Sequence, residues 1–280
     1  MSTATREKRP VSKRPAQVLH VQDSGASITV SPFFRWKAAL ERGAAAVLFV
    51  AALPLMGVIV VVIRATSAGP AIFRQVRVGR NGRLFTMYKF RTMVQSAEAK
   101  TGPVWAVAND PRLTRIGRIV RKTHLDELPQ LWNVVRGEMG LVGPRPERPE
   151  FTHSLEAAIP GYANRLAVLP GITGLAQINL PPDSDLDSVR RKLVLDLEYV
   201  RHGNLSIDFR VLLCTCFRAV GFSGYQASRL LAVRREVTLP CDTSESETKA
   251  RETAPSEIEP ARSNGHAPVA ELAVAARRPR

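Results

Sequence analysis

Cysteine is scarce in this sequence, which has three in 280 residues: Cys214, Cys216 and Cys241. An odd number excludes a fully paired disulfide framework, and no histidine stands at a zinc-finger spacing from Cys214 and Cys216. We therefore expect reduced cysteines that act as small apolar fillers. A signal-peptide pattern is also missing, because the one long apolar run starts only at Gly43 and carries no small-residue cleavage site.

Acidic residues are few relative to basic ones, with 25 Asp and Glu against 40 Lys and Arg and a formal net charge of +15. The two ends add little to this excess, because residues 1–30 and 241–280 together hold 11 basic and 9 acidic residues. The excess positive charge therefore belongs to residues 31–240. Such a surface attracts nucleic acid, phosphate-rich substrates or acidic lipid headgroups, and charge alone does not choose among them.

The two ends of the chain show no apolar periodicity. Residues 1–30 are basic and contain Pro and Ser, while residues 241–280 mix both charges with Pro, Ser and Ala. Both compositions predict disorder, as a basic arm and a tail. Between them we expect a membrane helix in residues 31–67 and a cytoplasmic domain in residues 68–240.

Residues 43–63 contain no charged side chain. A helix of this length reaches roughly 30 Å, about the thickness of the hydrocarbon core of a bilayer; a buried helix of a soluble protein is the alternative. Pro54 predicts a kink in the middle, and basic residues flank both ends of the run. The positive-inside tendency then favours a re-entrant hairpin broken at Pro54, while a single crossing stays open as the second topology.

The rest of the chain predicts an α+β, mainly helical fold. Two β-prone stretches flank the turn residues 79–82 and predict a small β-hairpin within residues 70–92. Apolar spacing predicts helices across residues 111–137. An amphipathic piece at residues 225–235 fits a helix lying in the lipid headgroup layer, although an ordinary surface helix fits it equally well.

Asp126 and Glu127 are adjacent acids that follow a strongly basic stretch. A carboxylate in such surroundings stays ionised, and a phosphate group is drawn to the same place. An ionised Asp can attack an activated phosphorus, and a neighbouring Glu can hold a divalent cation that neutralises a diphosphate leaving group. The alternative is a pair of surface acids that only form ion pairs with their neighbours.

Three cations are candidates for binding phosphate. Arg145 lies between Pro144 and Pro146, and a guanidinium on a stiff loop offers planar, bidentate recognition of phosphate. Lys89 and Arg91 stand two apart in a probable strand, which predicts that they share one face. A solvated basic strand and a merely stiffened loop are the structural alternatives.

Longer motifs make the chain similar to a known family over about residues 34–220. They include Gln75-x-Arg77-x-Gly79-x-Asn81-Gly82 and Lys89-Phe90-Arg91-Thr92-Met93, and further Leu125-Asp126-Glu127-Leu128-Pro129-Gln130-Leu131-Trp132-Asn133-Val134, Leu141-Val142-Gly143-Pro144-Arg145-Pro146, Pro170-Gly171-Ile172-Thr173-Gly174-Leu175-Ala176-Gln177 and Asp196-Leu197-Glu198-Tyr199. In this order they resemble the bacterial sugar transferases, the monotopic polyprenyl-phosphate phosphoglycosyl transferases.

The resemblance implies an enzyme of the bacterial inner membrane whose catalytic domain faces the cytoplasm. It implies transfer of a sugar-1-phosphate from a nucleotide-sugar, usually a UDP-sugar, to polyprenyl (undecaprenyl) phosphate, which initiates exopolysaccharide, O-antigen or other surface-glycan synthesis. Asp126 would be the nucleophile that forms an aspartyl-phosphosugar, and Glu127 would bind Mg²⁺ or position the phosphate. Lys89, Arg91 and Arg145 would bind substrate phosphates, and Asp196 and Glu198 are weaker candidates for the nucleotide-sugar site.

The sequence departs from the family pattern at three places. Many relatives have an Asp three residues after the Arg that opens the membrane helix, but here Ala45 follows Arg42. The break in the helix is often Ser-Pro, whereas this chain has Leu53-Pro54, and Gly140 stands where relatives often have Ser. The missing hydroxyl removes one candidate for capping the freed backbone groups of a hairpin.

Two hypotheses from other functional classes remain as alternatives to an enzyme. A basic membrane-associated protein that binds nucleic acid would explain the charge, but no nucleic-acid motif or aromatic platform accompanies it, so we expect no nucleic acid among the partners. The other hypothesis is a non-catalytic assembly partner at the membrane. The intact Asp126-Glu127 pair argues against it. The expected partners are the nucleotide-sugar, the polyprenyl phosphate and membrane lipid, and a homo-oligomer stays open.

Overall fold

The computed structural model describes residues 28–95, 97, 110–219, 221–222, 224–235 and 237. The chain divides into residues 1–239 and residues 240–280, and the second unit lies wholly outside the described residues. The predictions of a disordered arm and a disordered tail therefore stay predictions. The architecture below concerns the first unit.

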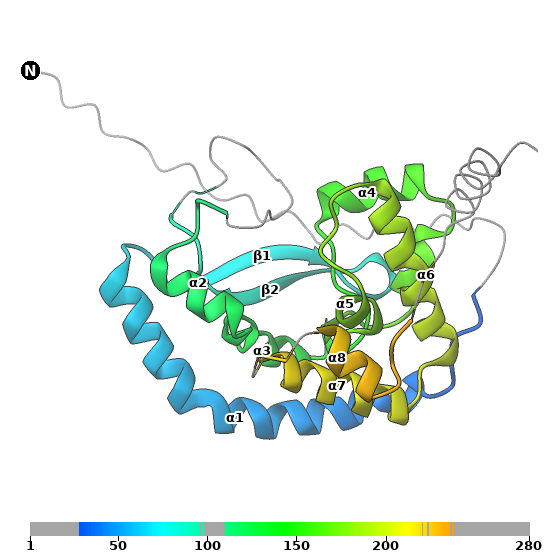
Figure 1. The fold of residues 1–280 in the computed structure, drawn as a ribbon, viewed down its shortest axis with the longest axis horizontal. Coiled ribbons are helices and arrows are strands. Elements are labelled where there is room, and N and C mark those ends of the chain that lie inside the picture. Colours follow the sequence, from blue (N-terminus) through cyan, green and yellow to red (C-terminus); the bar gives the residue numbers. More distant parts are fainter. Residues whose placement is uncertain are drawn as a thin grey trace, which may run out of the picture. The chain divides into compact units, whose positions relative to one another are not determined.

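Helices dominate the described residues, with two pairs of short strands (Figure 1). In chain order the elements are α1 (Phe34–Thr66), β1 (Ile72–Val78), the 3₁₀ turn η1 (Arg80–Gly82), β2 (Leu84–Phe90), α2 (Arg115–Lys122), η2 (Leu125–Glu127), α3 (Gln130–Val135), β3 (Gly140–Val142), α4 (Pro149–Ala158), η3 (Tyr162–Ala167), β4 (Gly171–Thr173), α5 (Leu175–Asn179), α6 (Leu186–His202), α7 (Leu205–Ala219) and α8 (Gly224–Leu230). The mainly helical class is confirmed. The amphipathic piece at residues 225–235 is helical only in its first half, because α8 ends at Leu230.

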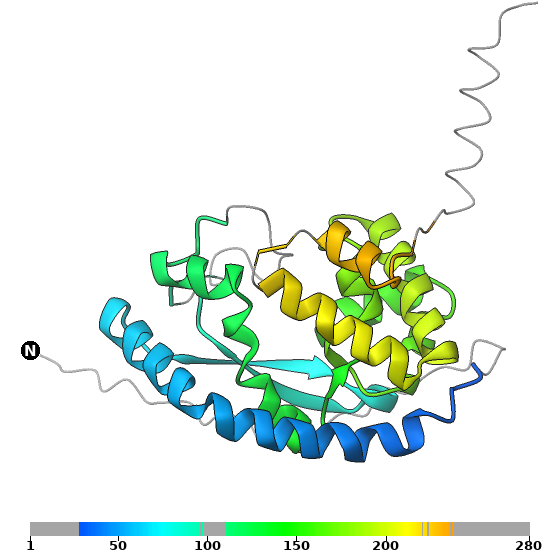
Figure 2. The ribbon, with the colours of Figure 1, turned by 60° about the horizontal axis from the view of Figure 1, so that its bottom comes forward.

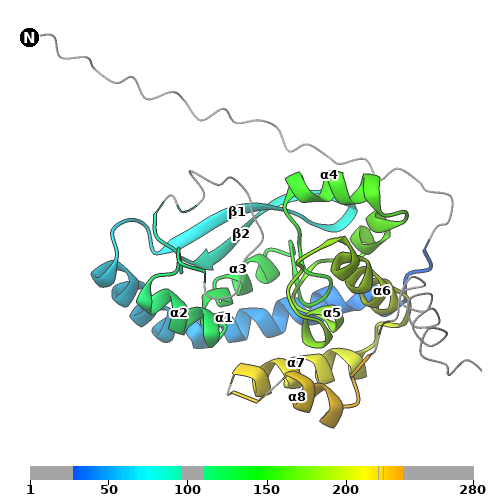
Figure 3. The same ribbon diagram turned by 45° about the horizontal axis from the view of Figure 1, so that its top comes forward.

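The predicted β-hairpin is confirmed. Strands β1 and β2 pair antiparallel, with Ile72 opposite Phe90 and Val78 opposite Leu84. The turn between them needs two residues of left-handed backbone, and Asn81 and Gly82 take φ values of 55° and 74°, which these two residue types adopt at low cost. Helix α3 lies between this hairpin and α1 (Figures 1 and 3).

Strands β3 and β4 form a short parallel pair in which Gly140 lies opposite Gly171 and Val142 opposite Thr173. The residue after β3 and the chain that leads into β4 approach so closely that only glycine fits at Gly143 and Gly171. A Cβ atom on Gly171 would lie 2.1 Å from the nitrogen of Gly143, and one on Gly143 would lie 2.5 Å from the carbonyl oxygen of Leu169. This contact fixes the start of the loop that carries Arg145.

Helix α1 is one continuous helix of 33 residues that is curved around the domain (Figures 1 and 2). The predicted break at Pro54 is not found. Pro54 is exposed, on the face that points away from the domain, so the clash of its ring is relieved by curvature instead of a break. The re-entrant hairpin is therefore not confirmed, and among the described residues α1 is the one helix long and apolar enough to cross a membrane.

Two faces of α1 have different surroundings although both are apolar. The inner face packs against the hydrophobic core of the domain at positions spaced three or four residues apart: Ala45, Phe49, Ala52, Met56, Ile59 and Ile63. Phe49 reaches Trp132 of α3, with 5.6 Å between the ring centroids. The outer face leaves large apolar side chains exposed: Val47, Leu48, Val50, Leu53, Leu55, Val58 and Val61.

A buried polar network fastens the first turns of α1 to the domain. Lys37 forms ion pairs with Glu41 and with Asp208 of α7, the second at 2.7 Å. Glu41 also accepts a hydrogen bond from the amide of Val142 at 3.0 Å, and the hydroxyl of Tyr199 donates to Asp208 at 2.6 Å. Glu41 thus supplies a carboxylate in the first turns of α1, one turn before Ala45, the position at which the family pattern predicts an Asp.

Candidate active site

The acids Asp126 and Glu127 lie in η2, a single 3₁₀ turn between α2 and α3. His124 takes a left-handed backbone with φ of 57° and reverses the chain after α2. Gly117 lets α2 lie directly on the segment after β2, since a Cβ there would be 1.9 Å from the carbonyl oxygen of Thr92. The turn is therefore held next to β2 and Lys89.

Asn133 of α3 docks this region on the edge of β2. Its buried side-chain amide donates to the carbonyl of Thr86 at 2.7 Å and accepts from the amide of Tyr88 at 3.2 Å. The side-chain amide of Asn133 thereby makes the same pair of hydrogen bonds with β2 that the backbone of a neighbouring strand would make. Asn133 belongs to one of the motifs shared with the family, but nothing in the sequence indicates its role, which depends on the packing of α3 against the edge of β2.

Glu127 is bound by two cations from distant parts of the chain. Its Oε1 accepts hydrogen bonds from Lys89 Nζ at 3.2 Å and from Arg145 Nη2 at 3.1 Å. Burial raises the pKa of Glu127, but the charges of Lys89 and Arg145 outweigh burial and lower this pKa to about 2. Glu127 is therefore ionised at every physiological pH, as expected from its basic surroundings.

Asp126 has a different environment, although it is the next residue. It is 7% exposed, and no described side chain donates a hydrogen bond to its carboxylate. Burial and the neighbouring charge of Glu127 raise its pKa to about 6. The expectation that a carboxylate in these surroundings stays ionised therefore holds for Asp126 at neutral pH, where roughly nine in ten of its carboxylates are charged. Its pKa is nevertheless raised and not lowered, because the nearest cations pair with Glu127.

Arg145 lies on a loop, residues 143–148, that is fixed from four directions. Four consecutive carbonyl oxygens accept hydrogen bonds from different elements: Pro144 from the amide of Gly171 at 2.9 Å, Arg145 from Arg165 Nη2 at 2.8 Å, Pro146 from Arg77 Nη1 at 3.0 Å and Glu147 from the amide of Val78 at 2.9 Å. The sequence predicted a loop stiffened by its prolines. The structure shows that its surroundings fix it as well, two of them guanidinium groups.

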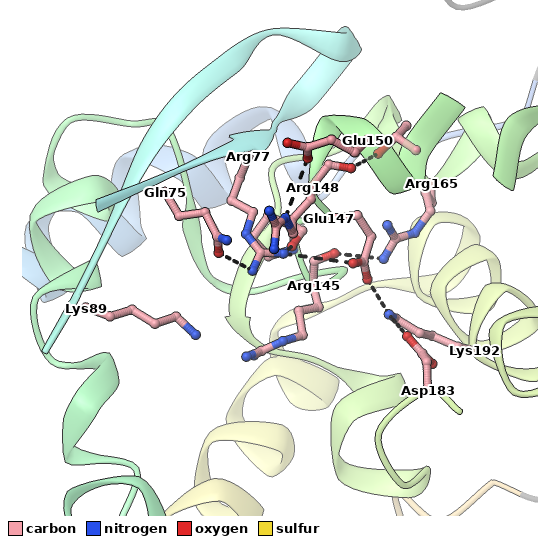
Figure 4. Close-up of polar contacts among 12 residues, drawn as sticks. Gln75, Arg77, Lys89, Arg145, Glu147, Arg148, Glu150, Arg165, Asp183 and Lys192 are labelled. Carbon is pink, nitrogen blue, oxygen red and sulfur yellow. Dashed lines mark hydrogen bonds and ion pairs between the residues drawn. The ribbon is translucent and has the colours of Figure 1, made fainter. Parts of the chain in front are cut away.

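The side chains of Lys89 and Arg145 point toward one another (Figure 4). Both form an ion pair with Glu127. Behind Arg145, Glu147 pairs with Lys192 at 2.5 Å and faces Arg77 at 3.9 Å. Burial raises the pKa of Glu147, but Lys192 and Arg165 outweigh it, and the pKa falls to about 2. The cations around the loop are thus partly balanced by buried acids, while Lys89 and Arg145 share one carboxylate.

Arg91 does not join this group. Strand β2 ends at Phe90, so the alternation that would put Lys89 and Arg91 on one face stops between them. The Arg91 guanidinium donates to Ser67 O at 2.9 Å, Ser67 Oγ at 2.7 Å and Ala68 O at 2.5 Å. It therefore caps the chain where α1 ends, and the prediction that it shares a face with Lys89 is wrong.

The acids of α6 are not brought to η2 either. Asp196 is 2% exposed and pairs with Arg165, whereas Glu198 pairs with Arg235 at 2.7 Å and is partly exposed. Residues two apart on a helix point about 200° from each other, so the two acids of this motif cannot share a site. Contact of either acid with a nucleotide-sugar stays a prediction that this geometry does not favour.

Arg77 and Arg165 are site residues that sequence reasoning did not single out. Arg77 had a signal, because it shares a strand face with Gln75 and, through the register of the hairpin, with Lys89. Burial lowers the pKa of Arg77 to about 10, and the group still stays charged. Arg165 had no such signal: it lies in a 3₁₀ segment, and only the packing of η3 on α6 brings it to the loop.

Comparison with known proteins relates the chain to sugar transferases, both by a family model and by individual relatives. The model of a family described as bacterial sugar transferase matches residues 33–221. The undecaprenyl-phosphate glucose phosphotransferase of Komagataeibacter xylinus is 39% identical, over 68% of this chain and 37% of the relative. An N-acetylgalactosaminephosphotransferase of Aeromonas hydrophila, which acts on undecaprenyl phosphate by its name, is 38% identical over 70% and 46%. A UDP-glucose:undecaprenyl-phosphate glucose-1-phosphate transferase of Caulobacter vibrioides is 38% identical over 74% and 78%. The chain thus spans less than half of the first two relatives and most of the third.

Proposed function

The chain belongs to the bacterial sugar transferase family, and we propose from this that it transfers a sugar-1-phosphate from a nucleotide-sugar to undecaprenyl phosphate. The names of its relatives supply both substrates, since they describe UDP-sugar donors and this lipid phosphate. The observation that carries the proposal is the arrangement in η2, where a carboxylate to which no side chain of the described residues donates a hydrogen bond lies beside one that holds two cations. The product would be the first lipid-linked sugar of an exopolysaccharide, an O-antigen or another surface glycan.

Asp126 is the nucleophile in this proposal. One of its carboxylate oxygens attacks the phosphorus that carries the sugar, and the bond from that phosphorus to the bridging oxygen breaks. A nucleoside monophosphate leaves with the bonding electrons, and an aspartyl-phosphosugar remains. An oxygen of the lipid phosphate then attacks the same phosphorus and displaces Asp126, which is regenerated as a carboxylate.

The two environments of the neighbouring acids support these roles. A carboxylate with a raised pKa is more basic and hence a better nucleophile, and Asp126 is still mostly charged at neutral pH. Glu127 keeps Lys89 and Arg145 together beside the nucleophile instead of pairing them with it. Both cations then face the place where phosphate oxygens gain charge in the transition state.

The residues present fit a magnesium ion whose coordination is completed by the phosphates of the substrate. Among the described residues no three His, Cys, Asp or Glu side chains gather, so an all-protein cage is not available. Mg²⁺ is usually held by one or two carboxylates together with phosphates and water. Glu127 uses only Oε1 for its two cations, so its Oε2 would hold the ion. When bound, Mg²⁺ would neutralise the diphosphate of the donor.

We further propose that α1 embeds the protein in the cytoplasmic leaflet of the bacterial inner membrane. Its inner face packs on the charged domain along its length, while its outer face exposes apolar side chains that lipid would cover. A charge on the outer face, as in Val50→Glu, should release the protein from membranes without unfolding it. Ala52→Glu on the inner face should instead destabilise the fold; equal membrane retention of Val50→Glu and wild type would refute this placement.

The direct test uses full-length protein in detergent with Mg²⁺, polyprenyl phosphate and a panel of nucleotide-sugars. We expect release of a nucleoside monophosphate with at least one donor, and intact-mass analysis without acceptor should show one sugar-phosphate added to the protein. Peptide mapping should place that mass on Asp126. No product with any donor, or an adduct on another residue, would overturn the proposal.

A further inference from the structure

The buried pair of Asp196 and Arg165 lies outside the reacting centre but touches the loop that carries Arg145. We propose that Asp196 orients Arg165, and that Arg165 in turn holds the main chain of Arg145, so that both are positioning residues for the phosphate site. The idea rests on the proposed function, because it assigns Arg145 to substrate phosphate. It gives Asp196 a task other than direct contact with the nucleotide-sugar.

The guanidinium of Arg165 donates hydrogen bonds both to the carboxylate of Asp196 and to the main chain of the Arg145 loop. Arg165 Nε and Nη2 donate to Asp196 Oδ2 at 2.9 and 2.7 Å, and Nη2 also donates to the carbonyl oxygen of Arg145 at 2.8 Å. Arg165 Nη1 reaches the hydroxyl of Tyr162 at 3.3 Å. Arg165 and Asp196 are each 2% exposed, so the guanidinium has no freedom to leave the carbonyl for water.

The position of this carbonyl matters because the guanidinium of the same residue, Arg145, is the proposed phosphate-binding group. The Arg145 side chain is 37% exposed, and Nη2 reaches Glu127 at 3.1 Å. A long, partly exposed side chain keeps its aim only if its own backbone is fixed. A misplacement of about 1 Å at a phosphate-binding group can lower a rate by about 10²-fold. The carbonyl of Arg145 is the point of the loop next to that side chain.

Asp196 is needed because a buried guanidinium cannot stay there unpaired. Its carboxylate also cancels the charge of Arg165, which would otherwise repel Arg145 on the loop and Arg77 of β1, which donates to the same loop. The pair therefore offers donors to the loop without adding net positive charge. A neutral residue in place of Asp196 would remove both effects.

A double-mutant cycle separates this role from direct contact with the donor. The variants are Asp196→Asn, Arg145→Ala and the double variant, assayed for kcat and KM with the nucleotide-sugar. If Asp196 acts through Arg145, Asp196→Asn should lower kcat/KM by about 10- to 100-fold in the wild-type background and by less than about 3-fold when Arg145 is already Ala. Effects that multiply in the double variant would overturn the proposal.

A second variant guards against simple misfolding of Asp196→Asn. Arg165→Lys keeps a cation beside Asp196 but cannot bond to the carboxylate and the Arg145 carbonyl in the same forked way. It should lower kcat/KM with the same dependence on Arg145. Hydrogen exchange of the peptide that covers residues 143–148 should become faster in Arg165→Lys, and unchanged exchange would count against the proposal.

Asp187→Asn is the matched control, because it also removes an acid from α6 but one that is exposed and pairs with the exposed Arg190. It should change neither exchange of the loop nor kcat/KM. The readouts also separate the two proposals. If wild-type protein releases no nucleoside monophosphate from any donor, the proposed function fails, while hydrogen exchange still decides whether Arg165 holds the loop.

Discussion

Two short acidic segments of this protein invite comparison, Asp126-Glu127 in η2 and Asp196-x-Glu198 in α6. Both stand in basic surroundings, and both resemble motifs of one family. In η2 the adjacent acids share a site, where one carboxylate holds two cations and the other accepts no hydrogen bond from a side chain that the structure describes. In α6 the acids point apart, and each forms an ion pair with an arginine, Asp196 with Arg165 and Glu198 with Arg235. The difference shows that an acid is available for chemistry only where its neighbours leave its lone pairs unused.

The same contrast concerns stability. Burial and Glu127 raise the pKa of Asp126 to about 6, so its charge is unfavourable in the fold at neutral pH. Burial raises the pKa of Asp196 as well, although Arg165 and Lys192 act against this rise. The two acids differ in their partners, because Asp196 is paired with a buried guanidinium whereas no described side chain donates a hydrogen bond to Asp126.

The largest effect that separates the segments should come from Asp126→Asn. Without a nucleophile the covalent adduct should disappear and turnover should fall by at least about 10³-fold. The melting temperature at pH 8 should not fall, because the substitution removes an unfavourable buried charge. Asp196→Asn should instead lower the stability by about 3–5 kcal/mol. A destabilised Asp126→Asn with residual turnover would show that the two acids do not differ as described.

Glu127→Gln should have the next largest effect. It leaves Lys89 and Arg145 without their shared carboxylate, and we expect turnover to fall by about 10²-fold. Because the folded pKa of Glu127 is lowered to about 2, its charge contributes stability above the unfolded pKa of 4.5 that is lost as the pH falls toward 2. Denaturant unfolding at pH 7 should show a loss of about 2–3 kcal/mol. Equal stability of the variant and wild type would contradict the ion-pair geometry.

The pH dependence should show a more gradual effect. Attack needs the Asp126 carboxylate, so the rate of adduct formation should be flat above a pH of about 6 and fall about tenfold per unit below it. The folded protein holds this proton more tightly than the unfolded chain, so this group lowers stability as the pH rises from about 4 to 6. Single-turnover rates measured from pH 5 to 8 check the first part, and an inflection near pH 4 would refute the raised pKa.

The smallest effect should come from Glu198→Gln. Its side chain and that of Arg235 are 31% and 37% exposed, and ion pairs of this kind contribute about 0–1 kcal/mol. We expect the melting temperature and kcat/KM to change little, the latter by less than about twofold. A large rise in KM for the nucleotide-sugar would restore Glu198 as a substrate contact and would remove the contrast between η2 and α6.

The fold could be predicted where the chain alternates between apolar and polar residues or carries turn residues. The hairpin followed from Asn81-Gly82, and the helices near η2 followed from apolar spacing. Helix α1 was harder, because residues 43–63 are apolar on all sides and periodicity cannot tell the face on the domain from the exposed face. The prediction of a break at Pro54 rests on the hydrogen bond that proline cannot donate and on the basic residues at both ends of the run, whereas the structure accommodates Pro54 on the exposed face of one continuous helix.

The sequence by itself determined the kinds of chemistry available to this protein: adjacent acids among cations, an arginine between prolines, and an uncharged segment long enough for a bilayer. Tertiary structure decided which groups meet. Lys89 and Glu127 are 38 positions apart, and Arg165 and Asp196 are 31 apart. Such pairs depend on how whole elements pack, and local periodicity carries no information about that. For this reason Arg91, which a strand pattern paired with Lys89, lies at the end of α1, and Arg165, which no pattern marked, holds the Arg145 loop.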